Sequence, residues 1–530
     1  MAEHRDGESA ENEHWPAGRR VWFVAAEATP FIKVGGLADV AGELPRALHR
    51  LGVRISLCLP FHGGMKMPNP SFPDPEGRNP SLTNQPFLVK QLDAGASGKT
   101  RKATTLQGSA GFSNGGLHDG IPCKVQVWLS DVLPVRVYEI PGLFGRENVY
   151  AYSDDAERFA AFCLAVAADA ETEANPPDIL HLNDWHAAPL AMLVRHAPES
   201  GEGAMLRRIH TLLTIHSLEY QGLGRPSLAD LYGLGPSVMG EEGASFSGGF
   251  NALKAGIAWS DAITTVSPSY AREILKPGNG FGLDSFLAER VKTRSKQRYA
   301  GILNRLGTTW NPAIDEALVV RYDAKTLLNR RQNKAALQEE LGLPETMEPL
   351  AVYIGRLVET KGIGLLLDAV EAWLQSGMQL VILGTGEGKY QERIQMLSEK
   401  YPNAIACRFA FDERLARRMY GAADLLLMPS RREACGLSQQ IAMRYGCLPV
   451  VRKTGGLKDT VKDGTNGFVF SAETTGALDR TVRRAWRLFR EDGENRAWHR
   501  MMQAAMQVDS GWVGSARTYL SLYLDLLDEV

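Results

Sequence analysis

The sequence has few cysteines, no long apolar run and no surplus of either charge. Six cysteines are scattered over 530 residues, and none forms a C-x-x-C pair. Neither a disulfide framework nor a structural zinc site is therefore indicated, which is typical of a reduced, cytoplasmic protein. No stretch approaches the roughly 18 consecutive apolar residues of a membrane-spanning helix.

The charged residues nearly balance, with a formal net charge of −2. Without a basic surplus we expect no nucleic-acid partner, and any anionic ligand must be met by a local cluster of cations. The first 18 residues are polar and charged and lack the apolar segment of a signal peptide. We predict that residues 1–18 form a disordered tail.

Short apolar runs alternate with helical patterns along most of the chain, as in α/β proteins. In the first half the predicted strands are 21–26, 55–59, 125–129, 135–140, 179–182, 212–215 and 263–266. In the second half they are 350–354, 380–383, 405–409, 425–428 and 449–451. Continuous apolar strands between helices indicate parallel sheets covered on both faces, and the alternation occurs twice. We therefore predict two doubly wound, Rossmann-like domains facing a central cleft.

The polar segment 290–299 places the domain boundary near residue 300. We expect the domains to cover 19–300 and 301–507, with an amphipathic helix in 508–530 that packs back on the first domain. Segment 63–122 is rich in Gly, Pro, Ser and Asn. It is predicted to be a long surface loop or an insertion.

The region around 424–438 combines a strand, a turn and a helix start, and the turn contains Glu433. The N–H groups of a helix start can hold a phosphate, and a carboxylate one turn earlier can bind the two hydroxyls of a ribose. Arg356 and Lys361 follow the first strand of the second half. Two cations there can stabilise a departing diphosphate without a metal ion, although a solvated loop pair is the alternative. The pattern is typical of a nucleotide-sugar site.

The segment after the first strand contains Lys33, Gly35 and Gly36. Two glycines let the backbone approach an anion closely, and the lysine supplies charge. A simple strand-to-helix turn is the alternative interpretation.

The order of these motifs resembles that of bacterial glycogen synthases and plant starch synthases. The first half carries K-x-G-G-L followed by Asp39, D-W-H at 184–186, T-I-H-S-L-E-Y-Q-G at 214–222 and S-P-S-Y-A-R-E-I at 267–274. The second half carries G-R-L at 355–357, K-G at 361–362 and T-G-G-L at 454–457. Many motifs in one order, over roughly residues 20–525, are far more specific than a single glycine pattern.

The resemblance implies a glycosyltransferase of the GT-B fold, an ADP-glucose:α-1,4-glucan 4-α-glucosyltransferase. Such enzymes transfer glucose to the non-reducing end of glycogen, starch or a maltooligosaccharide, with retention at the anomeric carbon. The resemblance implies no cofactor and no metal, and we expect no membrane partner. It also assigns the acceptor to the first domain and the nucleotide sugar to the second.

The resemblance further implies roles for individual residues. The implied catalytic residues are His216, which contacts the 6-hydroxyl of the donor glucose, Arg356, Lys361 and Glu433. The implied donor-binding residues are Lys33, Gly35, Gly36, Asp39, Asn304, Phe411, Cys435, Gly436, Leu437 and Ser438. Asp184 and Tyr150 are expected on the acceptor side.

A satisfied core histidine is the alternative for His216, and Phe411 and Cys435 also have structural alternatives. Phe411 matches a position that stacks on adenine, but it can equally be a core residue at a strand end. Cys435 lies in the Glu433 turn and is expected to be a buried, inert thiol. Trp185 is expected to pack, and the role of His186 is open.

The chain departs from the family pattern near the donor site. Asn304 is followed by Arg-Leu-Gly where the family has Gly, then Ile or Val, then Asp. Ser217 replaces an asparagine, Arg432 an aromatic residue and Ala434 a proline. The second glutamate of some related transferases is Ile441 here, so the resemblance implies a front-face displacement assisted by the leaving phosphate rather than two opposed carboxylates.

These departures leave three functions open. The first is an ADP-glucose-dependent glucan synthase. The second is a retaining transferase with another nucleotide or a small acceptor. The third is a catalytically silent glucan-binding paralogue.

Overall fold

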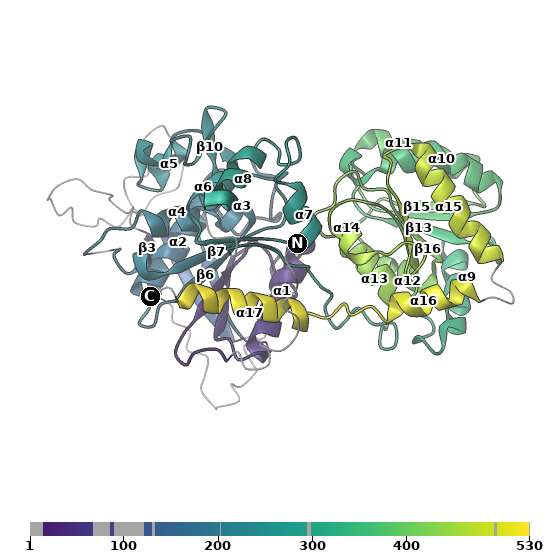
Figure 1. Cartoon of the computed structure of the whole chain (residues 1–530), viewed down its shortest axis with the longest axis horizontal. Helices are drawn as coiled ribbons and strands as arrows, with labels where there is room; N and C mark the ends of the chain where they lie inside the picture. Colours follow the sequence, from purple (N-terminus) through teal and green to yellow (C-terminus); the bar gives the residue numbers. More distant parts are fainter. Residues whose placement is uncertain are drawn as a thin grey trace. The chain divides into compact units, whose positions relative to one another are not determined.

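The chain divides into two compact units, shown in Figure 1. The computed structural model describes residues 14–66, 85–89, 121–129, 133–201, 203–293, 298–491 and 496–528. Unit 1 consists of the described residues of Met1–Val266, Ala271–Ile302 and Trp512–Val530, and unit 2 of those of Ser267–Tyr270 and Leu303–Gly511. Most of the predicted tail and most of the predicted insertion at 63–122 lie outside the described residues.

Unit 1 is built around a sheet with the strand order β12-β11-β7-β6-β1-β2-β5-β4-β3. Its strands are β1 (Val21–Val24), β2 (Ile55–Pro60), β3 (Gln85–Val89), β4 (Ile121–Leu129), β5 (Pro134–Glu139), β6 (Ile179–Asn183), β7 (His210–Ile215), β11 (Ala262–Thr265) and β12 (Tyr299–Gly301). A separate small antiparallel sheet contains β8 (Leu223–Gly224), β10 (Gly249–Asn251) and β9 (Ser245–Phe246).

The predicted parallel sheet is wrong at one edge of unit 1. Strand β4 runs antiparallel to both β5 and β3. Only 130–133 separates β4 from β5, and so short a connection can join antiparallel strands but not parallel ones. Cys123 and Val125, two residues apart on β4, are buried while their neighbour Lys124 is partly exposed, the alternation of a half-buried strand rather than a fully covered one.

Helices cover both faces of the unit 1 sheet. The helices of this unit are α1 (Gly36–Arg50), α2 (Asp155–Thr172), α3 (Asp184–Ala187), α4 (Pro189–Arg195), α5 (Leu228–Leu231), α6 (Ala252–Trp259), α8 (Asp284–Thr293) and α17 (Val513–Leu527). Helix α7 (Pro268–Glu273) is divided between the units, because its residues up to Tyr270 belong to unit 2 and those from Ala271 to unit 1. Helices α1 and α17 share one apolar core with β1 and β2, whereas α2, α3, α4 and α6 gather on the opposite side of the sheet in Figure 1.

The last helix is held in unit 1 by both apolar and polar contacts. The predicted stripe of Trp512, Ala516, Tyr519, Leu520, Tyr523 and Leu527 is buried throughout. The Tyr523 hydroxyl lies 2.6 Å from Nδ1 of His181 on β6, whose Nε2 lies 2.7 Å from the Thr214 hydroxyl on β7. Trp15 packs edge-on against Tyr523, so the predicted disorder of the tail does not extend to this residue.

Unit 2 contains a second sheet, with the order β15-β14-β13-β16-β17-β18 and every pairing parallel. Its strands are β13 (Leu350–Ile354), β14 (Gln379–Leu383), β15 (Ile405–Arg408), β16 (Leu425–Met428), β17 (Leu448–Arg452) and β18 (Phe468–Phe470). All of the strands predicted for both halves are present; the strand expected at 125–129 begins earlier, at Ile121. The structure therefore confirms the predicted α/β class with two Rossmann-like sheets.

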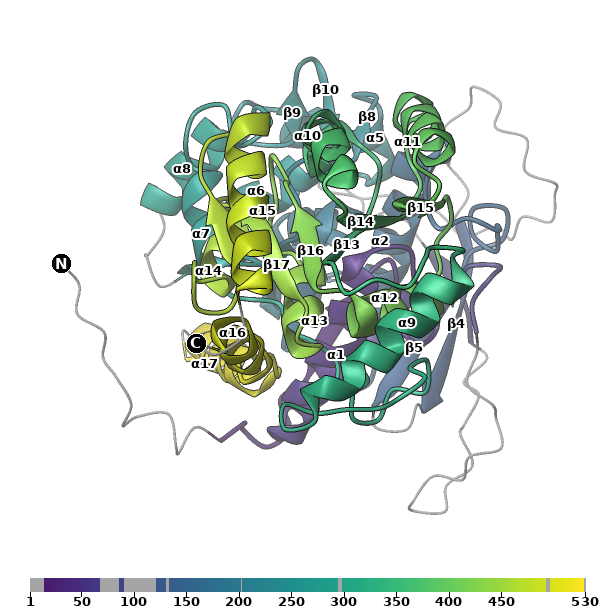
Figure 2. The same cartoon turned by 90° about the vertical axis from the view of Figure 1, so that its right-hand side faces the viewer.

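The helices of unit 2 lie on both faces of its sheet, as Figure 2 shows from the side of this unit. They are α9 (Arg330–Glu340), α10 (Ile363–Gln375), α11 (Gly388–Lys400), α12 (Glu413–Ala422), α13 (Ser438–Arg444), α14 (Gly455–Thr460), α15 (Thr475–Arg490) and α16 (Ala497–Met506). Helix α10 packs beside α11 and α15, whereas α9 packs beside α12 and α13 beside α16. The predicted helix near Ser438 is α13.

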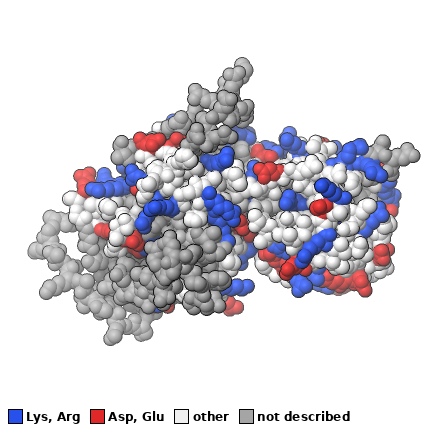
Figure 3. Space-filling model, turned by 90° about the horizontal axis from the view of Figure 1, so that it is seen from below, with Lys and Arg blue, Asp and Glu red and all other residues white. Residues whose placement is uncertain are grey.

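Charges of both signs are interspersed on the face of the molecule drawn in Figure 3. None of the described helices combines the length and the apolar character needed to cross a bilayer.

Candidate active site

Each sheet has a point where the strand order reverses direction, and ligands of doubly wound folds bind outside the carboxyl ends of the strands there. In unit 1 this point lies at β1, which has β2 on one side and β6 on the other. In unit 2 it lies between β13 and β16. The segments that follow β1, β6 and β7 in unit 1, and β13 and β16 in unit 2, carry most of the predicted site residues.

The turn after β1 is organised around Glu27, a residue that the sequence reasoning did not select. Its side chain is 2% exposed and accepts hydrogen bonds from the backbone N–H of Val34 at 2.5 Å and of Gly35 at 3.0 Å. The Tyr150 hydroxyl also donates to it. Burial raises the pKa of Glu27 above its ordinary value, and these three hydrogen bonds oppose the rise. The buried carboxylate of Glu27 therefore fixes the backbone of the predicted glycine turn.

Lys33, in the same turn, contacts another predicted donor residue. Its Nζ lies 2.8 Å from Oδ1 of Asp39 on the first turn of α1. Gly36 begins that helix, and Gly35 is its N-cap residue. The structure thus brings Lys33, Gly35, Gly36 and Asp39 together at one helix start.

The segments after β6 and β7 are joined by Asp184. This residue has a φ of 56°, in the left-handed region, and is 9% exposed. Its Oδ1 accepts hydrogen bonds from the backbone N–H groups of His216 at 2.7 Å and of Ser217 at 3.4 Å. Burial raises the pKa of Asp184 to about 7. Strained backbone at a strand end is frequent in active sites, and here it aims the carboxylate at the turn that carries His216.

The imidazole of His216 is oriented by Asn183, the last residue of β6. Nε2 of His216 lies 3.0 Å from Oδ1 of Asn183, so Nε2 carries the proton and Nδ1 is left as the acceptor. Burial lowers the pKa of His216 to about 3. The ring is therefore neutral at physiological pH and can exchange hydrogen bonds with a sugar hydroxyl.

Trp185 and His186 pack rather than reach into the turn. Trp185 lies edge-on to Phe159, and His186 lies 4.9 Å from the ring of Tyr150 between ring centroids. A Cβ atom at Gly222 would approach the Trp185 ring to 2.2 Å. The predicted packing role of Trp185 agrees with these contacts, and they give His186 a packing role as well.

In unit 2 the ends of β13 and β16 meet through an ion pair. Nζ of Lys361 lies 2.7 Å from Oε2 of Glu433, and the Ser430 hydroxyl donates to the same oxygen at 3.2 Å. Arg356 follows β13 directly and is exposed, and the Tyr353 hydroxyl donates to its carbonyl oxygen at 2.7 Å. These predicted catalytic groups of unit 2 therefore lie at the switch point of its sheet.

The Glu433 turn is closely packed against two glycine segments. A Cβ atom at Gly455 would lie 1.7 Å from the Glu433 carbonyl oxygen, and one at Gly362 would lie 1.9 Å from the Pro429 carbonyl oxygen. Both glycines also have positive φ, 43° and 70°. The T-G-G-L and K-G motifs are thus explained by the close approach of the backbone that carries Glu433.

Asn304 lies behind this turn. Its carbonyl oxygen accepts hydrogen bonds from Nε2 of Gln440 at 3.0 Å and from Sγ of Cys435 at 3.8 Å. Within the described part of the chain, its side-chain Oδ1 is buried without a hydrogen-bond partner. Burial raises the pKa of Cys435 to about 12, which agrees with the predicted inert thiol.

The remaining predicted donor residues of unit 2 follow β15 and β16. Phe411 follows β15 and is 72% exposed, which removes the alternative of a core residue. Gly436 and Leu437 precede α13, which begins at Ser438. Among the described residues, no group of three or more His, Cys, Asp or Glu side chains could hold a metal ion.

Three of the residues that depart from the family pattern form hydrogen bonds with other segments of the chain. Nη1 of Arg305 donates to the Asp509 carbonyl oxygen at 2.8 Å, and the Leu306 N–H donates to the Ser510 carbonyl oxygen at 2.9 Å. Arg432 is exposed. The carbonyl oxygen of Ala434 accepts a hydrogen bond from the Ser267 hydroxyl at 2.6 Å, which anchors the turn where the family has a proline.

Glu27 and Asn183 were missed by the sequence reasoning. Both stand at the carboxyl end of a predicted strand, where a polar side chain after an apolar run is a usable signal. What they contact could not be read from that signal, because their partners lie on other segments.

Two family models match most of the chain. Residues 20–289 match the family model described as the starch synthase catalytic domain, and residues 334–495 match the one described as glycosyl transferases group 1. A glycogen synthase from Anaeromyxobacter sp. (strain Fw109-5) is 39% identical over 520 residues, covering 96% of this chain and 99% of the relative. A glycogen synthase from Kosmotoga olearia is 38% identical over 519 residues, covering 96% and 98%.

Solved structures show the same relationship. The catalytic domain of Starch Synthase IV from Arabidopsis thaliana, bound to ADP and acarbose, superposes with a TM-score of 0.82 at 30% sequence identity, covering 97% of this chain and all of that one. A sucrose-phosphate synthase from Thermosynechococcus elongatus reaches a TM-score of 0.56 at 17% identity, a likeness of fold alone.

Proposed function

Because the chain belongs to the family of glycogen synthases and starch synthases, and is therefore a glycosyltransferase, we propose that it transfers glucose from ADP-glucose to the non-reducing end of an α-1,4-glucan. Retention at the anomeric carbon and independence of metal ions are part of the proposal. So is a cytoplasmic location, which the six free cysteines support. The ADP bound to the Arabidopsis relative supports an adenosine diphosphate donor.

The observation that carries the proposal is the contact between Lys361 and Glu433, 2.7 Å apart at the switch point of unit 2. The ammonium of Lys361 and the guanidinium of Arg356 stabilise the negative charge that develops on the departing diphosphate. Glu433 accepts hydrogen bonds from the ribose hydroxyls. The ion pair between the lysine and the glutamate holds both side chains at the switch point.

Other residues of unit 2 complete the donor site in this proposal. The exposed ring of Phe411 stacks on the adenine. The N–H groups of Gly436, Leu437 and Ser438, beside Cys435, face the distal phosphate. The unpartnered Oδ1 of Asn304 supports a ligand contact there, because buried acceptors are otherwise satisfied.

The residues of unit 1 act on the transferred glucose. Neutral His216 exchanges a hydrogen bond with the 6-hydroxyl, and Asp184 holds the His216 backbone while it faces the sugar. The turn of Lys33, Gly35, Gly36 and Asp39 binds the donor. Tyr150 was predicted to line the glucan groove.

The reaction proceeds by displacement on the front face of the glucose. The bond from C1 to the phosphate oxygen breaks as the 4-hydroxyl oxygen of the acceptor bonds to C1, and the hydroxyl proton passes to the departing ADP. Ile441, in place of a second glutamate, is buried in α13, which supports a route without a glycosyl-enzyme intermediate.

The experiment is a donor assay on the purified full-length chain. ADP-glucose and UDP-glucose are each offered with maltooligosaccharides, with and without a chelator, and the product length and anomeric configuration are measured. We expect lengthened α-linked chains from ADP-glucose, unaffected by the chelator. Lengthening from UDP-glucose alone favours the transferase with another nucleotide, and glucan binding without turnover favours the silent paralogue.

A further inference from the structure

Tyr150 lies in a position that serves the donor turn rather than an open groove. Its hydroxyl donates to Glu27, and Glu27 in turn accepts the N–H groups of Val34 and Gly35. The ring packs against His186, 4.9 Å away between centroids, and against Phe159. The phenol is therefore connected to the Lys33–Gly36 turn by two successive hydrogen bonds, both of which are accepted by the Glu27 carboxylate.

The segment that carries Tyr150 is locked by Arg158 on α2. This arginine is fully buried; its Nε donates to the Leu143 carbonyl oxygen at 2.7 Å and its Nη1 to Oδ1 of Asp155 at 2.5 Å. The other carboxylate oxygen of Asp155 accepts the N–H of Ala151 at 2.8 Å. Ala151 has a φ of 73°, so the bond holds a backbone conformation that an alanine does not favour.

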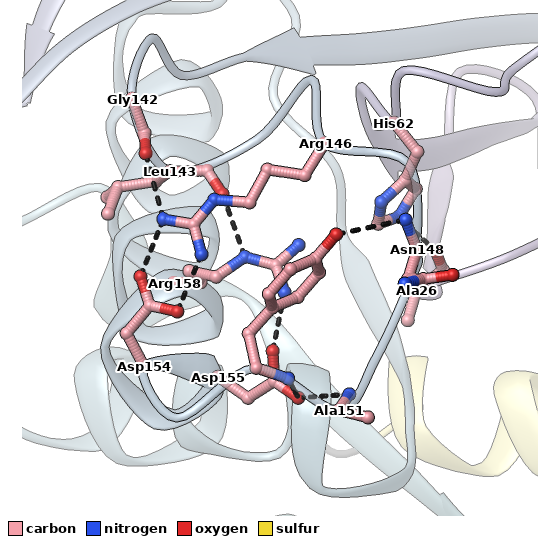
Figure 4. Close-up of polar contacts among 11 residues, drawn as sticks. Ala26, His62, Gly142, Leu143, Arg146, Asn148, Ala151, Asp154, Asp155 and Arg158 are labelled. Carbon is pink, nitrogen blue, oxygen red and sulfur yellow. Dashed lines mark hydrogen bonds and ion pairs between the residues drawn. The ribbon is translucent and has the colours of Figure 1, made fainter.

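A second arginine closes the same segment, as Figure 4 shows. Arg146 forms a two-pronged contact with Asp154, each bond 2.7 Å long, and also donates to the Gly142 carbonyl oxygen at 3.0 Å. The Tyr152 hydroxyl accepts the Asn148 N–H at 3.0 Å. Residues 142–155 are therefore held on both sides of Tyr150 by contacts within unit 1.

This degree of constraint exceeds what a flexible acceptor groove needs. A buried arginine and a residue in the left-handed region both cost free energy, and such costs persist where a position must be held accurately. The contacts of residues 142–155 fix the position of Tyr150, whose hydroxyl donates a hydrogen bond to Glu27.

We propose that Tyr150 is a positioning residue for the donor: through Glu27 it fixes the Lys33–Gly36 turn, and it does not bind the glucan. The inference rests on the proposed function, because it names the substrate on which Tyr150 acts. It also replaces the acceptor role expected for this residue. The nearby Asp39 carboxylate raises the pKa of Glu27, and Glu27 in turn raises the pKa of Asp184. Each hydrogen bond to Glu27 therefore helps to stabilise its negative charge.

The test compares Tyr150→Phe with Tyr152→Phe, which removes only the acceptor of the Asn148 N–H and keeps the arginine contacts of the segment and every hydrogen bond to Glu27. Hydrogen exchange of the peptide that contains Val34 and Gly35 reports on the turn without any substrate. We expect faster exchange there in Tyr150→Phe and wild-type exchange in Tyr152→Phe. Unchanged exchange in Tyr150→Phe would overturn the proposal.

Steady-state kinetics then separate the two substrates. In Tyr150→Phe the KM for ADP-glucose should rise roughly tenfold, while the KM for maltooligosaccharides stays within about twofold of wild type. Glu27→Gln should show the same pattern, and the double variant should be little worse than Glu27→Gln alone. A rise confined to the glucan KM, or additive effects in the double variant, would contradict the proposal.

The two measurements distinguish two failures. If the wild-type protein transfers no glucose from ADP-glucose, the proposed function fails, and the exchange measurement alone decides whether Tyr150 fixes the turn.

Discussion

Two opposite charges, Lys361 and Glu433, face each other at the switch point of unit 2 although 71 residues separate them in sequence. The side chain of Glu433 is 9% exposed, so its charge needs a partner of opposite sign. The pairing with Lys361 supplies the opposite charge that this largely buried carboxylate requires.

The first prediction concerns Lys361→Ala. In the proposed reaction this lysine stabilises the departing diphosphate, so we expect kcat to fall about 100- to 1,000-fold, the usual cost of one charge-stabilising group. The KM for the glucan should stay near the wild-type value. Steady-state kinetics with both substrates varied provide the measurement.

The matched control is Lys400→Ala. Lys400 also forms an ion pair, 2.9 Å from Glu371, but both side chains are well exposed on α10 and α11. Such pairs contribute little, so the control should retain wild-type kinetics. An unchanged kcat in Lys361→Ala would remove this lysine from the catalytic set.

The second prediction follows from the raised pKa of Asp184, about 7. In the unfolded chain this carboxyl loses its proton near a pKa of about 4, so between these values the folded chain binds more protons and rising pH lowers its stability. Asp184→Asn has no such dependence, and asparagine tolerates the left-handed backbone. The unfolding free energy of the variant minus that of wild type should rise by on the order of 2 to 4 kcal/mol from about pH 4.5 to about pH 7.5.

Asp154→Asn provides a control of opposite sign. The Arg146 guanidinium lowers the pKa of Asp154, so its carboxylate stabilises the fold above the unfolded pKa and loses this effect as pH falls. The variant should therefore lose more stability at the higher pH. Denaturation curves at both pH values measure the unfolding free energy of each variant relative to wild type. If this difference changed with pH in the same way for both variants, the raised pKa of Asp184 would be refuted.

At the scale of the element, the turn from Pro429 to Gly436 depends on backbone approach. The N–H groups of Arg431 and Arg432 donate to the Thr360 carbonyl oxygen at 2.9 and 3.3 Å, and the N–H of Gly456 donates to the Glu433 carbonyl oxygen at 3.2 Å. Three segments that are distant in sequence thus pack backbone against backbone. At Gly362 and Gly455 the approach leaves no room for a Cβ atom.

The third prediction is that Gly455→Ala disables the site. Its Cβ would meet the Glu433 carbonyl oxygen at 1.7 Å, so the turn must move. We expect activity to fall at least about tenfold, because small displacements of catalytic groups are costly. Gly464→Ala is the control: it has a φ of 70° but nothing within 4 Å of the added atom. It should lose about 1 kcal/mol of stability through backbone strain and keep its kinetics.

The elements themselves were largely predictable. Buried parallel strands such as β13 and β16 are continuous apolar runs, which sequence patterns reveal directly. Short edge strands such as β12 and β18 have three residues each and carry too little pattern to detect. Strand β4 was predicted, but its antiparallel direction was not, because the direction depends on the length of the connection to β5 rather than on the residues of the strand itself.

For the candidate site, the sequence predicts where its residues lie along the fold but not which side chains contact one another. His216, Arg356 and Glu433 stand at strand ends, where the topology concentrates ligand contacts. The pairing of Lys361 with Glu433, and of Tyr150 with Glu27, depends on which strand ends become neighbours. That information lies in the strand order, which periodicity does not contain.

At the scale of the molecule, each unit has its own buried polar network in addition to its apolar core. In unit 1 the Tyr523 hydroxyl reaches His181. In unit 2 the Tyr322 hydroxyl donates to the Tyr445 carbonyl oxygen at 2.7 Å. Each tyrosine joins segments more than 100 residues apart.

The fourth prediction is that the two networks stabilise their units separately. Tyr523→Phe leaves His181 without one partner and should lower the stability of unit 1 by about 1–3 kcal/mol. Tyr322→Phe should act on unit 2 instead. Hydrogen exchange resolved by peptide measures both, and a loss of protection in the wrong unit would contradict the division of the chain.

Helix α17 gives this architecture a consequence for biosynthesis. It belongs to unit 1 but follows the whole of unit 2 in the chain. During translation the ribosome therefore releases every strand of the first sheet long before the helix that covers one of its faces. The apolar surface of α1 and β1 that α17 covers stays partly exposed to solvent until Leu527 has been synthesised. We expect nascent chains that end before this residue to bind chaperones.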